Sequence, residues 1–217
     1  MSLIFWHDPI SEPSRTVYYV IKKLGIEHEL KQVAIVKDTR TEEFKKDVNP
    51  AGLIPVIKHD DQFIYESSTI IRYLLDAFDP EEVLLPRTDL KERAKVDYWL
   101  SWRNTTYRPA SDTAIMKMIV NPMFLGADKP SEEECKALVK ATQDELAVIE
   151  AAVTDKPYLA GDHLTIADVY LYNEILEGHH LFKLELDGKV KEWFDRVNED
   201  EIVKELTDVL LEILASM

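Results

Sequence analysis

The chain has 217 residues, of which 46% are hydrophobic, and this suits a globular protein of one large or two small domains. Acidic residues outnumber Lys and Arg by 41 to 26, and the net charge of −15 argues against nucleic acid and anionic membranes as partners. The sequence contains no run of about 18 apolar residues that would span a bilayer.

The first predicted elements are a strand and a helix. Leu3–Trp6 is a short apolar run that predicts a buried strand. Ser11 and Pro13 occupy positions typical of a helix start, and Gly25 stands where that helix would end. Between them, apolar residues recur on one helical face, namely Val17, Val20, Ile21 and Leu24.

A second strand and a short helix are predicted next. Residues 29–35 favour a strand, and Thr39 with Glu42 has the spacing of a capping box that opens a helix. Apolar residues at 54–57 and 63–65 then flank a polar turn and predict a hairpin.

A helix is predicted after Ser67, with apolar residues at Ile70, Tyr73, Leu74, Ala77 and Phe78. The order strand, helix, strand, helix, hairpin, helix predicts a small mixed sheet whose first two strands are parallel. We expect this α/β domain to comprise residues 1–78.

Residues 79–88 contain two prolines and read as a linker. Residues 89–217 have helical periodicity throughout, which predicts an all-helical bundle of about five helices. In Leu164–Asp168, Thr165 and Asp168 are spaced as a capping box, which we interpret as a folding signal without a catalytic role.

The compartment is suggested by cysteine usage. Cys135 is the only cysteine, so no internal disulfide can form, as is usual in a reducing compartment. The first eight residues lack the basic and apolar stretches of a secretory signal. We therefore expect a cytoplasmic protein.

An α/β domain joined to a helical bundle is expected to leave a cleft between them, which is a usual place for a ligand. The first strand–helix turn would open onto this cleft. The helix N-terminus there offers free N–H groups and a partial positive charge, so it would stabilise a bound anion such as a thiolate.

Motifs along nearly the whole chain resemble those of theta- and delta-class cytosolic glutathione transferases. The active-site turn is matched by Ser11–Tyr18, where Ser11, Pro13 and Arg15 keep the family spacing. Further matches, in order, are Val48–Pro50, Ile54–Pro55, Glu66–Ser67, Ala94–Tyr98, Trp102–Arg108, Asn121–Gly126 and Leu164–Asp168.

The resemblance implies a thioredoxin-like N-terminal domain, an all-α C-terminal domain that forms the electrophile side of the cleft, and a homodimer. It implies that glutathione is the co-substrate and that its sulfur is conjugated to small hydrophobic electrophiles. Some members of the family also reduce organic hydroperoxides.

By this resemblance, Ser11 is the catalytic residue and its hydroxyl donates a hydrogen bond to the glutathione sulfur. Lowering a thiol pKa from about 8.5 to about 6.5 takes roughly 2.7 kcal/mol. A hydrogen bond to a charged group supplies about 1.5–3 kcal/mol and a helix terminus about 0.3–1 kcal/mol, so no general base is needed. The spacing alone is equally compatible with Ser11 as the cap of the first helix.

The resemblance assigns the γ-glutamyl end of glutathione to Glu66 and Ser67, the former facing its ammonium group and the latter its carboxylate. A plain helix cap is the alternative at this position. Ile54 would pair through its backbone with the cysteinyl part, because the family has a cis proline at the position of Pro55. Without the resemblance, a trans bond would be expected.

Lys37 and Arg40 are the candidates for the glycine carboxylate of glutathione. Arg40 stands where the theta class has histidine, and a guanidinium can bind a carboxylate through two hydrogen bonds. A solvated surface arginine is the alternative.

Arg108 matches an arginine of theta enzymes that faces the electrophile, where a cation could stabilise a leaving anion. A salt bridge on the helix surface is the alternative. The other candidates for the electrophile site are Trp6, Ile10, Tyr107 and Ser111.

We assign no catalytic or metal-binding role to His7, His179 or His180. His7 adjoins the active turn and could act as a base, but we favour a structural role for it. His179 and His180 are adjacent and diverge by about 100° on a helix, so we predict no metal site.

Two other functions fit parts of the pattern. A thiol-disulfide enzyme on the same fold would need a nucleophilic cysteine at the turn, where this chain has Ser11. A non-catalytic glutathione transferase-like module that binds ligands or proteins remains open, because a fold does not fix a function.

Overall fold

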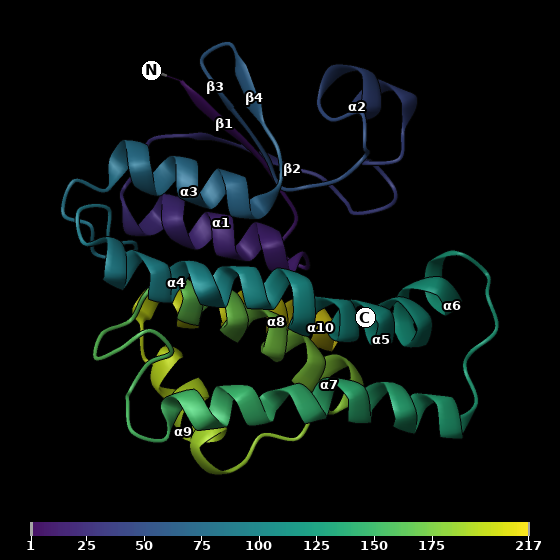
Figure 1. Ribbon diagram of the computed structural model, residues 1–217. Helices are drawn as coiled ribbons and strands as arrows, with labels where there is room; N and C mark the ends of the chain where they lie inside the picture. The colour runs from purple at the N-terminus through teal and green to yellow at the C-terminus, as the bar shows by residue number, and fades with distance from the viewer. Residues whose placement is uncertain (1, 217) are drawn as a thin grey trace. The chain divides into compact units, whose positions relative to one another are not determined.

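The computed structural model describes residues 2–216, except for the side chain of Phe124, and these form two compact units (Figure 1). The first unit contains the residues up to Val83 together with those from Glu199 onward. The second unit is Leu84–Asn198.

The first unit is built on a four-stranded sheet with the order β2-β1-β3-β4. β1 is parallel to β2 and antiparallel to β3, which pairs with β4 in the predicted hairpin. The predicted mixed sheet is therefore confirmed. The strands are β1 Leu3–His7, β2 Glu29–Gln32, β3 Val56–His59 and β4 Gln62–Ile64.

Two helices, α1 (Glu12–Lys23) and α3 (Ser67–Phe78), pack side by side against this sheet (Figure 1). The periodicity predicts most of the apolar face of α1 but only part of that of α3, where Ala77 is exposed and the unpredicted Ile71 and Leu75 are buried. Gly25 adopts φ +60° just after α1, a conformation that suits glycine and ends the helix as expected. Fully buried residues on the two faces are Val17, Val20, Ile21, Ile70, Ile71 and Leu74.

The short helix α2 spans Glu42–Asp47 and begins later than the capping-box spacing predicts. Thr41 caps it, since its hydroxyl accepts a hydrogen bond from the Phe44 N–H at 3.2 Å. The Thr39 hydroxyl instead accepts from the Val36 N–H at 3.2 Å within the preceding turn. The prediction that Thr39 opens the helix is therefore wrong, because a local turn engages its side chain.

The last helix, α10 (Glu201–Ser216), packs against α1 and belongs to the first unit. From the sequence, these residues are expected to belong to the helical domain instead. Apolar side chains of α10 are buried, and ion pairs reinforce the packing at 2.7 Å for Lys22–Glu205 and 2.8 Å for Lys23–Asp200.

The second unit is helical. Its first run is continuous and includes two single-turn π segments, which are often found at functional positions. Together with α10, the helices between residues 90 and 216 form five helical runs. The run comprises α4 Leu90–Trp102, η1 Arg103–Tyr107, α5 Arg108–Ile115, η2 Met116–Val120 and α6 Asn121–Phe124. The remaining helices are α7 Glu132–Val153, α8 Ile166–Phe182 and α9 Gly188–Val197.

The core of the second unit forms around α8, whose start is fixed by Asp168. This buried carboxylate accepts hydrogen bonds from Thr165, from the Leu159 N–H at 2.8 Å and from the Trp193 indole at 3.0 Å. Burial raises the pKa of the Asp168 carboxyl, and the hydrogen bonds oppose that rise. The predicted capping box thus also ties the start of α8 to α9.

No helix within residues 2–216 has both the length and the apolarity needed to cross a membrane.

Candidate functional site

One end of the sheet collects the predicted glutathione-binding residues of the first unit. The pairing of Trp6 with Val56 places the end of β1 beside the start of β3. The pairing of Ile57 with Ile64 places the end of β4 at the same edge. The turn after β1, the Ile54–Pro55 bond before β3 and Glu66 after β4 therefore lie at one end of the sheet.

The turn between β1 and α1 is held by backbone and side-chain hydrogen bonds. The Ser11 N–H donates to the Asp8 carbonyl at 3.0 Å, which closes the turn. The guanidinium of Arg15 is buried and donates to the carbonyls of Pro9 at 3.0 Å and Ile10 at 2.8 Å. These hydrogen bonds fix the backbone on both sides of Pro9 and Ile10, and they therefore hold Ser11 in place.

The Ser11 hydroxyl caps α1 and keeps its own proton available. Its oxygen accepts from the Ser14 N–H at 3.4 Å, which is long for such a bond. Among residues 2–216, none accepts a hydrogen bond from the Ser11 hydroxyl. An oxygen with two lone pairs and one proton can cap the helix and donate to an anion at once.

His7 is buried immediately before this turn. Its ring lies 5.3 Å from that of Phe5 and 5.1 Å from that of Tyr18, measured between centroids. Burial, and secondarily the charge of Arg15, lowers the pKa of His7 to about 4. A neutral imidazole of such low basicity favours the structural role over that of a general base.

Lys37 and Arg40 are exposed on the segment between β2 and α2. The Ala34 N–H donates to the Asp38 carboxylate at 2.8 Å, and this bond shapes the segment. Val36 adopts φ +67°, a strained conformation for a β-branched residue. Both cations therefore project from an ordered turn.

The Ile54–Pro55 bond is cis, as the resemblance implies. Nearby, Gly52 has φ +64°, and a Cβ atom at this position would lie 2.8 Å from the Thr39 carbonyl oxygen. Only glycine fits this close approach, which packs the turn before Pro55 against the segment that carries Lys37 and Arg40.

Glu66 precedes α3 with φ +64° and is exposed. Its carbonyl accepts from the Ile70 N–H at 2.9 Å, whereas its side chain makes no capping hydrogen bond. The Glu66 side chain therefore does not cap α3, which was the alternative to a role in glutathione binding. Strained backbone of this kind is often found at ligand sites. Ser67 follows as the first residue of α3.

In the second unit, Arg108 belongs to a buried charged cluster. The carboxylate of Glu174 is 1% exposed and accepts from Arg103, from Arg108 at 3.3 Å and from the Ser111 hydroxyl at 2.6 Å. Arg108 also pairs with Asp112 at 2.9 Å. Burial, the largest influence, raises the pKa of Asp112.

The surface salt bridge that was the alternative for Arg108 is thus present, in a partly buried form. Carboxylates hold the Arg108 guanidinium, and 29% of the Arg108 side chain is exposed.

The remaining electrophile-site candidates differ in exposure. Ile10 is 37% exposed on the turn before Ser11, whereas Tyr107 is fully buried. Burial, aided by the charge of Glu174, raises the pKa of the Tyr107 hydroxyl well above its usual range. Trp6 is half-buried on β1 beside Phe63, with ring centroids 5.8 Å apart. The roles of these residues stay predictions.

Sequence reasoning missed Asp8 and Glu174 as site-building residues. An acid directly after a buried strand is a signal for Asp8, and an acid inside the apolar run of α8 is a signal for Glu174. Within residues 2–216, no three His, Cys, Asp or Glu side chains are grouped to hold a metal ion.

Comparison with known proteins identifies the family of both units. Residues 5–82 match the model of the glutathione S-transferase N-terminal domain, and residues 112–201 match that of the C-terminal domain. Human glutathione S-transferase theta-1 is 30% identical over 97% of this chain and 90% of its own length. Bovine theta-1 is 31% identical over 91% of this chain and 82% of its own length.

Solved structures also point to the glutathione S-transferase family. Human glutathione transferase theta-2, in complex with glutathione and an unknown ligand, superimposes with a TM-score of 0.85 at 29% identity over 98% of this chain and 89% of that one. A human theta-class enzyme in complex with the glutathione conjugate of 1-menaphthyl sulfate gives a TM-score of 0.87 at 28% identity over 99% and 89%. The chain therefore belongs to the glutathione S-transferase family and is similar to its theta-class members.

Proposed function

We propose that this glutathione transferase conjugates glutathione to small hydrophobic electrophiles and that the Ser11 hydroxyl holds the glutathione sulfur as a thiolate. The observation that carries this proposal is the geometry of Ser11, which caps α1 through its oxygen and leaves its O–H free of acceptors among residues 2–216. A thiolate at this place gains both a hydrogen bond and the field of the helix N-terminus.

The rest of the tripeptide would lie along the same end of the sheet. Glu66 and Ser67 would bind its γ-glutamyl end, and the backbone of Ile54 before cis-Pro55 would pair with its cysteinyl part. Lys37 and Arg40 would bind the glycine carboxylate. Arg40, in place of the theta histidine, can do this with two parallel hydrogen bonds.

On the electrophile side, we propose that Arg108 stabilises a leaving anion. Glu174 and Asp112 fix its guanidinium, and its side chain is still 29% exposed. Trp6, Ile10, Tyr107 and Ser111 remain candidates for the surrounding wall. Reduction of organic hydroperoxides would use the same thiolate as nucleophile.

The test is the Ser11→Ala variant, assayed for conjugation with a panel of electrophiles and for glutathione binding by calorimetry. We expect kcat to fall by about 10²-fold or more, because a donor to developing charge is lost. The Kd for glutathione should change little, since the other contacts remain.

The outcomes separate the competing functions. Wild-type turnover in Ser11→Ala would refute the thiolate role. Glutathione binding by the wild type without turnover of any electrophile would favour a non-catalytic module.

We also propose that the protein is a cytosolic homodimer, as the family resemblance implies. Leu90 and Tyr98 on α4, which are 75% and 53% exposed, support an interface on this helix. The single cysteine supports the location. Sedimentation equilibrium would measure the assembly state directly, and a monomer at micromolar concentration would contradict the dimer.

A further inference from the structure

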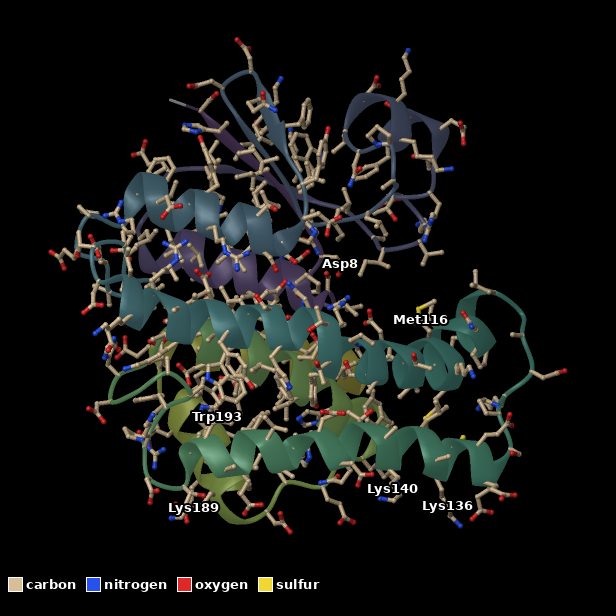
Figure 2. All side chains as sticks on the ribbon, viewed as in Figure 1. Asp8, Met116, Lys136, Lys140, Lys189 and Trp193 are labelled. Carbon is tan, nitrogen blue, oxygen red and sulfur yellow. The ribbon has the colours of Figure 1, made fainter. Side chains whose placement is uncertain are left out.

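The side chain of Asp8 links two separate segments of the first unit. It lies at the turn between β1 and α1 and is 7% exposed (Figure 2). Its Oδ1 atom accepts from the Ile10 N–H at 3.0 Å, and its Oδ2 atom accepts from the Ile35 N–H at 2.9 Å. One carboxylate therefore bridges backbone groups that are 25 residues apart in the chain.

The two segments carry opposite ends of the proposed glutathione site. Ile10 directly precedes Ser11, and the Asp8 carbonyl also accepts from the Ser11 N–H at 3.0 Å. Ile35 lies in the segment that bears Lys37 and Arg40. Asp8 thus contacts the backbone beside the thiolate donor and the backbone beside the two cations.

A carboxylate suits this task better than any neutral side chain. It has two acceptor oxygens and no donor, so both can receive a backbone N–H at the same time. Hydrogen bonds to an ionised acceptor are also stronger than those between neutral groups. Arg15, another buried charge at the turn, donates to the carbonyls of Pro9 and Ile10, on the Ser11 side of the bridge.

We propose that Asp8 is a positioning residue that sets the spacing between Ser11 and the Lys37–Arg40 segment, so that one side chain couples thiolate formation to recognition of the glycine carboxylate. This inference rests on the proposed function of the site. A purely local role would affect one segment only, whereas the bridge makes both respond to a single substitution.

The experiment compares Asp8→Asn and Asp8→Ala with Asp38→Asn as the matched control. The Asp38 carboxylate accepts from the Ala34 N–H within the cation-bearing segment and, among residues 2–216, makes no hydrogen bond to the turn before Ser11. Two quantities are measured for each folded variant. One is the ratio of Kd for γ-glutamylcysteine, which lacks the glycine, to Kd for glutathione. The other is the pKa of the thiol of bound glutathione.

In Asp8→Asn, one backbone N–H loses its acceptor and the other keeps only a neutral one. We expect the Kd ratio to fall by about tenfold, which corresponds to about 1.4 kcal/mol. We expect the pKa of the bound thiol to rise by about half a unit or more. Asp8→Ala should change both quantities further. Asp38→Asn should lower the Kd ratio and leave the thiol pKa unchanged.

The inference is overturned if an Asp8 variant changes only one of the two quantities, or neither, while the wild type binds glutathione with a lowered thiol pKa. If the wild type itself fails to bind glutathione, the proposed function fails and the inference falls with it. Because Asn keeps the volume of Asp, Asp8→Asn decides the matter even if Asp8→Ala does not fold, as monitored by near-ultraviolet circular dichroism.

Discussion

At the scale of single residues, Ser11 shows how one hydroxyl can serve the fold and the chemistry together. The sequence left two roles open, a helix cap and a donor to sulfur. The structure makes them compatible, because the cap uses a lone pair and the donor uses the proton. The cap bond of 3.4 Å is long, so the oxygen is not committed to α1 alone.

His7 gives a pH dependence that can be tested. Its pKa in the folded protein is about 4, below the unfolded value near 6.5, so the unfolded chain binds more protons between these values. The contribution of neutral His7 to stability is fully present above about pH 6.5 and is lost as the pH falls towards 4. The loss amounts to about 3 kcal/mol.

We therefore expect the free energy of unfolding of the wild type to decrease more steeply between pH 7 and pH 4.5 than that of His7→Phe. Phe keeps a ring against Phe5 and Tyr18 but cannot be protonated. Urea unfolding at both pH values measures this difference. Parallel pH profiles for the two proteins would show that His7 is not held neutral by the fold.

At the scale of elements, local patterns predicted most helices and strands, because the information lies in spacing. The β3–β4 hairpin, the apolar face of α1 and the buried positions Ile70 and Leu74 of α3 followed from the sequence pattern alone. The start of α2 did not, since Thr39 and Thr41 are both good caps. The choice between them depends on the turn that engages Thr39.

The start of α8 should be among the most sensitive positions in the chain. Asp168→Ala would remove the acceptor of the Leu159 N–H and of the Trp193 indole, both buried. We expect a loss of about 3–5 kcal/mol of unfolding free energy, because buried donors would be left unsatisfied.

The control for this prediction is the exposed capping box of α7, where Ser131 and Glu134 bond each other. Ser131→Ala should cost about 1 kcal/mol, the usual value for a cap in water. Chemical denaturation measures both variants. Equal losses would mean that the bonds of Asp168 to Leu159 and Trp193 add nothing beyond capping.

At the scale of the whole molecule, contacts between distant segments were beyond the reach of the sequence. Nothing local indicates that α10 packs on α1 or that Asp8 reaches Ile35. The cis state of Pro55 was implied only by the family resemblance, since most X–Pro bonds are trans. By contrast, the sequence predicted the parallel first pair of strands and the hairpin, although the order β2-β1-β3-β4, which brings the proposed site residues to one end of the sheet, comes from the structure.

The same limit applies to the charged cluster of the second unit. Glu174 is 71 residues away from Arg103 in the chain and 66 residues away from Arg108, and it pairs with both. A charged residue within an apolar helix indicates that it forms a buried ion pair. The identity of its partner depends on how the helices pack, which the sequence does not show. The cluster fixes Arg108, and the identity of the electrophile that it would face is a matter for the conjugation panel.

The central claim is that Ser11 stabilises the thiolate of bound glutathione. Its most direct test is the ultraviolet absorbance of enzyme-bound glutathione thiolate as a function of pH, in the wild type and in Ser11→Ala. We expect the bound thiol of the wild type to titrate about two units below a free thiol, and that of Ser11→Ala to return most of the way to the free value. A bound thiol with the same lowered pKa in both proteins would contradict the claim.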